Sequence, residues 1–175
     1  RLGPDPSVRA RHLVRSLRRG VARPWMRCMG RGWFEGGWRA LMPTWDARGQ
    51  HRGWRARQVL PGRDGPKAVG PAGFDGVGLV LASPFAVRML RGEAQPKRVI
   101  ISEGEPAFLA WVASGERTVF GIGSGWWTDD HADKIPTGCE VVIATGLDKA
   151  GDRYAEHVTR TLAGRCTVVR WRPTA

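Results

Sequence analysis

Apolar segments alternate with helical segments through the second half of the chain, and this alternation constrains the fold more than any other feature. The apolar, β-branched segments are 97–102, 118–122, 139–145 and 166–171, and the helical patterns between them cover 105–113, 128–134 and 149–163. Strands that alternate with helices form parallel βαβ units. We therefore predict an α/β fold, a parallel sheet with flanking helices, over residues 95–175.

The first half of the chain carries the whole excess of positive charge. Residues 1–94 contain 18 Lys and Arg against 6 Asp and Glu, whereas residues 95–175 contain 10 of each. Nearly all of the excess is arginine, which makes bidentate contacts to phosphate and stacks on bases. We predict a smaller basic α+β lobe over 1–94 that binds nucleic acid; the codon bias of a GC-rich genome is the alternative.

Four elements are expected within this basic lobe. Residues 7–19 have the pattern of a short helix, and 38–60 that of a β-hairpin whose turn lies at 46–49. An apolar strand follows at 76–82. A helix is then expected over 83–92, with Ser83 as its N-cap and Gly92 as its end.

Several classes of protein are disfavoured by composition. No apolar run approaches the roughly 20 residues that span a bilayer, and no signal-peptide core follows the basic N-terminus, so a soluble, cytoplasmic protein is expected. The three cysteines, Cys28, Cys139 and Cys166, form no CxxC pair, which disfavours a zinc site. Because the chain begins with Arg1, we expect it to be part of a longer protein.

Two carboxylates follow apolar strands directly. Glu103 ends the segment VIISE, and Asp148 follows VVIATGL. Active crevices of open α/β sheets lie beyond the carboxyl ends of the strands, so Glu103, the turn at 123–125 and Asp148 are expected at one edge. Paired carboxylates suit a hard divalent cation. Two alternatives stay open, since Glu103 would also serve as a helix N-terminal acid and Asp148 as an N-cap.

These residues resemble a known family. IISEGE (100–105) is similar to the Glu-Gly motif of Toprim domains, which occur in bacterial primases, topoisomerases and some nucleases. VVIATGLDKAGDRYA (141–155) resembles their Asp-x-Asp motif. The upstream segments LMPTWDARGQHRGWRAR and GPKAVGPAGF are similar to the basic lobe that precedes Toprim in primase-like proteins of phages, plasmids and mobile elements. The resemblance covers roughly residues 22–172 and implies a Toprim-like, Rossmann-like sheet.

The resemblance implies roles for individual residues. Glu103 would be catalytic, as a general acid/base or a metal ligand, and Asp148 would hold Mg²⁺ or Mn²⁺. Gly104 and Gly151 match glycines of the two motifs beside this site. The phosphates of template or nucleotide would lie against basic positions of the lobe, namely Arg55, Arg57 and Lys67.

Tryptophans are frequent in the basic lobe. The chain has nine, and five of them lie within residues 25–54. Interleaved with arginine they suit stacking on the bases of single-stranded DNA, and Trp54 between Arg52 and Arg55 is the best candidate. The alternative is that they fill the core of a small lobe.

The chain departs from the Toprim pattern at several positions. Gly146 stands where the first Asp of the Asp-x-Asp motif is expected, Ala107 stands where many primases carry a further acid, and no acidic pair follows Cys166. Asp152 and Glu105 are possible substitute ligands, with a solvated helix residue as the alternative for Asp152.

Three functions remain open after these departures. The first is Mg²⁺-dependent primer synthesis in DNA replication, on single-stranded DNA with nucleotides and with a helicase partner or fusion. The others are a catalytically degenerate module that binds nucleic acid, and a Toprim nuclease.

Two further segments favour ordinary structure over a binding site. The glycines of GIGSGWW (121–127) lack the spacing of a phosphate-binding fingerprint, and a tight turn explains them. Asp129, Asp130, His131 and Asp133 are interpreted as a solvated helix start rather than as a metal cluster.

Overall fold

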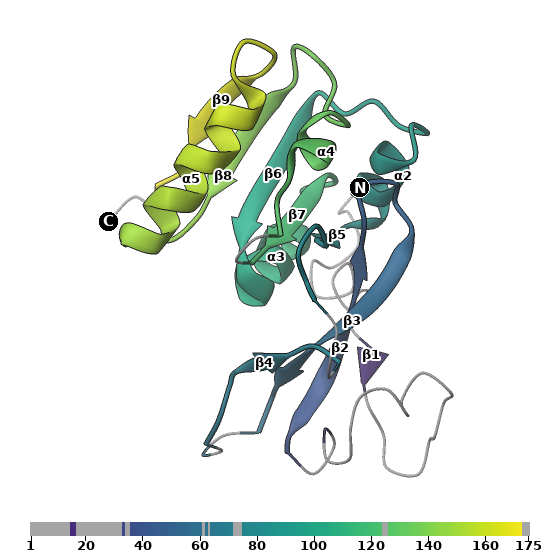
Figure 1. Cartoon of the computed structure of the whole chain (residues 1–175), viewed down its shortest axis with the longest axis vertical. Helices are drawn as coiled ribbons and strands as arrows, with labels where there is room; N and C mark the ends of the chain where they lie inside the picture. The colour runs from purple at the N-terminus through teal and green to yellow at the C-terminus, as the bar shows by residue number, and fades with distance from the viewer. Residues whose placement is uncertain are drawn as a thin grey trace, which may run out of the picture.

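Two β-sheets organise the molecule (Figure 1). One has four strands in the order β1-β2-β3-β4, and the other has five in the order β5-β7-β6-β8-β9. The computed structural model describes the chain in segments, which are residues 15–16, 33, 36–60, 62, 64–71, 75–123 and 126–172. No helix of these segments is long and apolar enough to cross a membrane.

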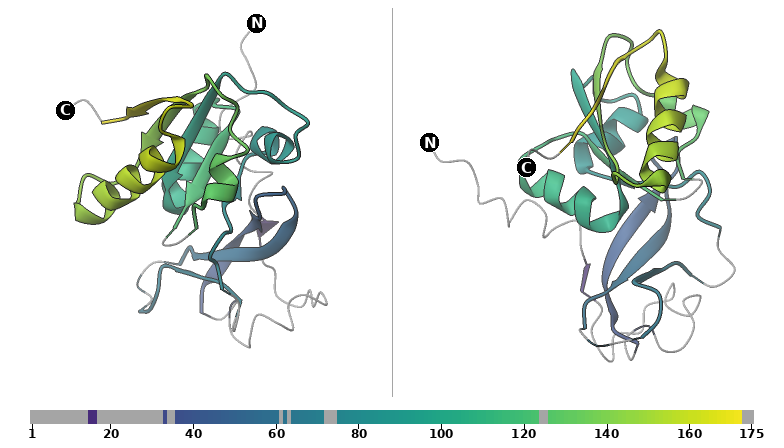
Figure 2. Two further views of the ribbon diagram at one scale, coloured as in Figure 1. Left: turned by 45° about the horizontal axis from the view of Figure 1, so that its top comes forward. Right: turned by 90° about the vertical axis from the view of Figure 1, so that its left-hand side faces the viewer.

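The five-stranded sheet is parallel apart from one edge strand, which confirms the predicted α/β fold. Its strands are β6 (Arg98–Glu103) in the centre, with β7 (Val119–Ile122), β8 (Glu140–Ala144), the edge strand β9 (Thr167–Arg170) and the antiparallel edge strand β5 (Leu81–Ala82). The helix α3 (Gly104–Ala113) covers one face, and α5 (Lys149–Leu162) covers the other (Figure 2). The short helix α4 (Asp129–Ala132) packs against α5.

The four-stranded sheet is built on the predicted hairpin. Its strands are β2 (Trp38–Trp45) and β3 (His51–Gln58), flanked by β1 (Arg15–Ser16) and β4 (Ala68–Val69), all antiparallel. The Asp46 carboxylate accepts hydrogen bonds from the backbone N–H groups of Arg48 and Gln50 and so closes the turn.

The helix predicted over 7–19 is wrong where the structure describes it. Arg15 and Ser16 form a strand that pairs with Leu41 and Ala40 of β2. A neighbouring strand offers hydrogen bonds that local sequence does not reveal, and this long-range pairing overrides helix propensity. The rest of that range, like Cys28, lies outside the described residues.

The strand predicted over 76–82 is shorter than expected. Only β5 is a strand, extended by an isolated bridge between Val80 and Trp45, and Gly78 adopts a φ of 70°. Because β5 pairs with β7, this segment and the following helix α2 (Pro84–Leu90) belong to the five-stranded sheet. Residues before 94 thus contribute the edge strand β5 and the helix α2 to this sheet, and the domain division expected at residue 94 stays a prediction.

The two ends of α2 confirm the predicted caps. The Ser83 hydroxyl accepts hydrogen bonds from the N–H groups of Ala86, at 3.3 Å, and Val119, at 3.1 Å. It thereby caps the helix and ties it to β7. After the helix, Gly92 adopts a φ of 76°, a conformation that favours glycine and ends the helix.

The hairpin is attached to the five-stranded sheet near its turn. Trp45 and Val80 exchange two backbone hydrogen bonds of 2.9 Å. Beyond them, Arg91 donates from Nε to the Gly49 carbonyl at 3.0 Å, and a Cβ at Gly49 would lie 2.7 Å from the Arg91 side chain. The turn therefore lies directly on the end of α2 (Figure 1).

Tryptophans contribute to both hydrophobic clusters. The main core lies between the five-stranded sheet and its helices. Trp126 and Trp127 belong to it, and Trp45 packs against it. A small second cluster joins Trp33 to Leu41 and Ala56, with Trp38 and Trp54 packed against it. The interpretation that tryptophans fill the core is thus confirmed for these residues; Trp25 lies outside the described part of the chain.

His131 corrects the interpretation of 129–133 as wholly solvated. Its side chain is 1% exposed and stacks on Trp127, while Asp129, Asp130 and Asp133 are exposed. Thr128 and the Nδ1 atom share a hydrogen bond of 2.8 Å, whereas Nε2 makes none with the described residues. Desolvation lowers the pKa of His131 to about 4, against the opposing fields of Asp130 and Asp46.

We predict that stability falls with acidity between pH 6.5 and pH 4. In this window His131 is protonated in the unfolded chain but stays neutral in the folded protein. The free energy of unfolding therefore decreases by up to about 3 kcal/mol as the pH falls. Urea titrations across this range measure the loss.

His131→Gln should flatten this dependence, while His51→Gln, at an exposed position, should preserve it. A wild-type curve that coincides with that of His131→Gln between pH 4 and pH 6.5 would contradict the assignment.

Candidate active site at the carboxyl edge of the sheet

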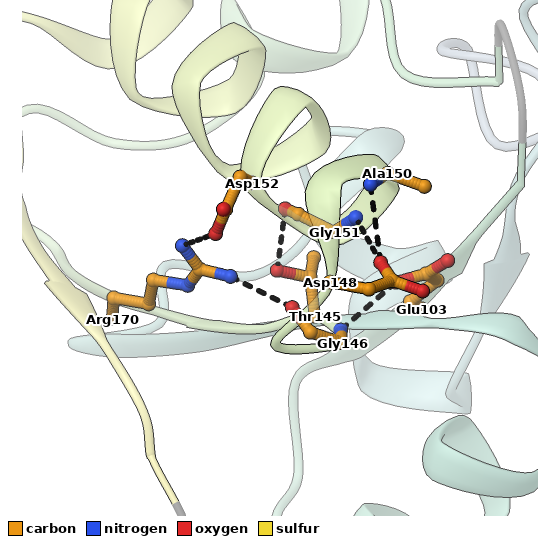
Figure 3. A network of polar contacts seen from close by, with 8 residues as sticks. All are labelled: Glu103, Thr145, Gly146, Asp148, Ala150, Gly151, Asp152 and Arg170. Atoms are coloured by element: carbon orange, nitrogen blue, oxygen red, sulfur yellow. Dashed lines mark hydrogen bonds and ion pairs between the residues drawn. The ribbon is translucent and has the colours of Figure 1, made fainter.

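Glu103 and Asp148 lie on either side of Gly146 (Figure 3). Glu103 ends β6, and Asp148 follows the adjacent parallel strand β8. The Gly146 N–H donates to Oε2 of Glu103 at 2.9 Å. A Cβ built on Gly146 would lie 3.4 Å from that oxygen and 3.5 Å from Oδ1 of Asp148. The fold thus brings together the two carboxylates that the strand pattern singled out.

The Glu103 carboxylate is available for a functional role. Glu103 occupies the N-cap position of α3 but makes no side-chain hydrogen bond to that helix. The chain turns from strand to helix at Gly104, where a φ of 73° favours glycine. Among the described residues only the Gly146 amide binds this carboxylate, and it binds Oε2, so Oε1 remains free for a ligand.

Asp148 has a structural role that leaves one oxygen unused. Its Oδ1 accepts hydrogen bonds from the N–H groups of Ala150, at 3.1 Å, and Gly151, at 2.8 Å (Figure 3). The N-cap interpretation is therefore correct. Within the described chain Oδ2 accepts no hydrogen bond, and Asp148 is exposed, so the same residue is able to cap α5 and bind a ligand.

Gly151 is required by packing. A Cβ at this position would lie 2.0 Å from the Gly146 carbonyl oxygen, so no other residue fits without displacing the turn. Thr145 adds a 2.9 Å hydrogen bond from its hydroxyl to the Gly151 carbonyl. This contact explains the Ala-Gly step of the motif, and the expected role of Gly104 and Gly151 beside a cofactor stays a prediction.

The residues at this edge fit one hard cation. Mg²⁺ is commonly bound through one or two carboxylates and completes its shell with water and phosphate. Glu103 and Asp148 supply two such carboxylates, each with a free oxygen. Asp152 instead forms an ion pair with Arg170. In the described segments no three His, Cys, Asp or Glu side chains gather as a metal site, and this includes 129–133.

Glu105 binds two arginines of the hairpin. Its buried carboxylate accepts from Nε of Arg55 at 2.8 Å through Oε1 and from Nη1 of Arg57 at 3.0 Å through Oε2. It therefore does not act as a substitute metal ligand. Glu105 lies in the first turn of α3, so the ion pairs hold both guanidinium groups at the start of this helix, where about 30% of the Arg55 side chain and 29% of that of Arg57 remain exposed.

The other candidate nucleic-acid residues are more dispersed. Arg52 lies beside Asp46 near the hairpin turn, and Lys67 is exposed just before β4. Trp54 packs against the cluster around Trp33. Trp54 and Arg55 both line a cavity of about 160 Å³, in which the Arg55 guanidinium stands 5.3 Å from the ring centre of Trp126. Of the predicted turn at 123–125, only Gly123 is described.

Solved primase structures resemble this chain over most of its length. The zinc-binding and RNA polymerase domains of Aquifex aeolicus primase match at 20% identity and a TM-score of 0.54, covering 94% of this chain and 39% of theirs. The E. coli primase catalytic core matches at 21% and 0.57, covering 79% and 46%. A DnaG primase catalytic domain bound to single-stranded DNA gives the same four values.

The chain has the fold of the primase Toprim core. The resemblance read from the motifs is thereby confirmed at the level of the fold. The chain spans less than half the length of the three primase structures described above. No family model matches it, and neither does any curated protein.

Arg170 is the residue that sequence reasoning missed. It lies at the end of β9, contacts Asp152 and donates to the Gly146 carbonyl at 2.7 Å (Figure 3). An arginine within VVRWRP resembles every other arginine of this chain, so only the spatial arrangement reveals its place beside the carboxylates.

We predict that Glu105→Gln lowers the free energy of unfolding by about 1–3 kcal/mol, because two guanidinium groups lose their charged acceptor. Urea unfolding at neutral pH measures the change.

Glu93→Gln is the matched control. Glu93 is exposed and stands 3.9 Å from Arg88, so its replacement should cost less than about 0.5 kcal/mol. Equal stability of the two variants would show that the ion pairs of Glu105 contribute nothing to the joint between the sheets.

Proposed function

We propose that this chain is a primase-like module of DNA replication that supports Mg²⁺-dependent nucleotidyl transfer on single-stranded DNA. The observation that carries the proposal is the pair of carboxylates, Glu103 and Asp148, beside Gly146 at the carboxyl edge of a primase-type sheet. The two arginines that Glu105 holds at the first turn of α3 would supply the positive charge that phosphates require.

Glu103 and Asp148 would hold the cation through Oε1 and Oδ2. Bound there, the ion would neutralise charge on the phosphate oxygens during phosphodiester formation. The Gly146 amide fixes the orientation of the Glu103 carboxylate, and the amides of α5 fix that of Asp148. Little side-chain entropy is then lost when the site binds its substrates.

The template would lie along the hairpin face that carries Arg55 and Arg57, with Lys67 beyond them. Arg55 keeps one edge of its guanidinium on Glu105 and has its plane near Trp126, which leaves its other N–H groups for phosphate. Affinity for single-stranded DNA should therefore fall steeply with salt concentration. A mobile-element origin, a helicase partner and nucleotide binding at this edge belong to the same proposal.

A second candidate function is nucleic-acid binding without catalysis. Gly146 favours it, because this position lacks the carboxylate that the family pattern supplies and Asp148 is partly engaged in capping α5. A nuclease would use the same two carboxylates, so a test of the site has to score both synthesis and cleavage.

We predict that Glu103→Gln abolishes Mg²⁺- or Mn²⁺-dependent primer synthesis and leaves the affinity for single-stranded DNA within about twofold. The amide keeps an oxygen for the Gly146 N–H but removes the charge that binds the ion. Synthesis is measured on a single-stranded template with labelled nucleotides, cleavage on the same labelled strand, and affinity by fluorescence anisotropy at several salt concentrations.

Glu140→Gln is the control, since Glu140 begins β8 at the opposite edge of the sheet. Primer synthesis that survives in Glu103→Gln would refute the role of this carboxylate. A wild-type protein that binds DNA with a steep salt dependence but makes no primers would establish the binding module, and strand cleavage would establish the nuclease.

A further inference from the structure

Arg170 extends a chain of contacts that begins at Glu103. The Glu103 carboxylate accepts from the Gly146 N–H, and the Gly146 carbonyl accepts from Nη2 of Arg170. The Nη1 group of Arg170 donates to Asp152 on the first turn of α5 (Figure 3). Gly146 is therefore held at its N–H by the Glu103 carboxylate and at its carbonyl by the Arg170 guanidinium.

The surroundings of Arg170 mark it as part of the site. Its side chain is 23% exposed, and its Nε is buried without a hydrogen-bond partner among the described residues. The guanidinium thus gives up hydration to reach Asp152 and the Gly146 carbonyl.

Gly151 closes the turn from another side. Its backbone approaches the Gly146 carbonyl so closely that a Cβ would stand 2.0 Å from that oxygen. Arg170 donates to the same oxygen. The turn that carries Asp148 is therefore held by contacts within the protein.

We propose that Arg170 is a resident cation of this edge, which neutralises Asp152, holds the Gly146 turn and restricts a divalent cation to Glu103 and Asp148. The inference rests on the proposed metal site and deepens it. Because the positive charge lies on the carbonyl side of Gly146, it repels a divalent cation bound on the amide side. Arg170 therefore lowers the affinity of the site for the ion that the site uses.

The composition of the edge agrees with this assignment. A carboxylate at position 146 would begin from a Cβ within 3.5 Å of both Glu103 and Asp148 and would add a third ligand. The chain has glycine there and an arginine on β9, so the edge offers two carboxylates rather than three and carries one additional cation.

The test is Mn²⁺ binding by isothermal titration calorimetry, with paramagnetic resonance of free Mn²⁺ as a second readout. Arg170→Gln should bind Mn²⁺ about tenfold more tightly than wild type, because a full positive charge leaves the edge. Arg172→Gln is the matched control, since Arg172 is an exposed arginine two residues further along, and it should change the affinity less than about twofold. Unchanged or weaker binding in Arg170→Gln overturns the proposal.

Two more variants keep the test decisive if Arg170→Gln folds poorly. Arg170→Lys retains the charge and should bind Mn²⁺ as weakly as wild type, whereas tight binding by this variant would contradict a charge-based role. Gly146→Asp tests the metal site itself and should raise the affinity.

These variants separate the two proposals. Tight binding by Gly146→Asp together with a wild-type affinity in Arg170→Gln would remove the role of Arg170 and keep the metal site. The absence of binding in every variant would remove both.

Discussion

The buried Glu105 carboxylate joins the two sheets, alongside the Trp45–Val80 bridge, the hairpin turn and the packing of Met42 and Trp45 of β2 in the main core. One of its oxygens binds Arg55 and the other binds Arg57, so a single residue of α3 fixes two consecutive outward positions of β3. The same contacts hold the Arg55 and Arg57 side chains of the hairpin at the first turn of α3, the helix that begins directly after Glu103. The position of these two positive charges therefore depends directly on this one carboxylate.

Sequence reasoning succeeded where structure is determined locally. The strand and helix periods of β6, α3, β8 and α5, the Ser83 cap and the Asp46 turn were each visible in a few consecutive residues. It failed where a partner distant in sequence decides the outcome. The residues of β1 pair with β2 rather than form a helix, and β5 is fixed by β7.

The candidate site shows the same division. Glu103 and Asp148 were predictable because Glu103 ends one apolar strand and Asp148 follows another, and the parallel register of β6 and β8 brings the two strand ends together. Glu105 was interpreted as a substitute metal ligand, because nothing in the sequence EGE reveals that two arginines about fifty residues earlier bind it. Arg170 gave no signal at all, because ion pairs form in space and leave no pattern along the chain.

The hairpin is attached at three separate places: at its turn by Arg91 on the Gly49 carbonyl, at Trp45 by the backbone bridge to Val80, and along β3 by the arginines on Glu105. Separate attachments along its length restrict rotation of the hairpin relative to the five-stranded sheet. A strand of nucleic acid would thus meet arginines and carboxylates whose spacing already exists, and ordering the two sheets would add little to the entropic cost of association. Discrimination between ligands would then depend on whether their phosphate spacing matches this fixed frame.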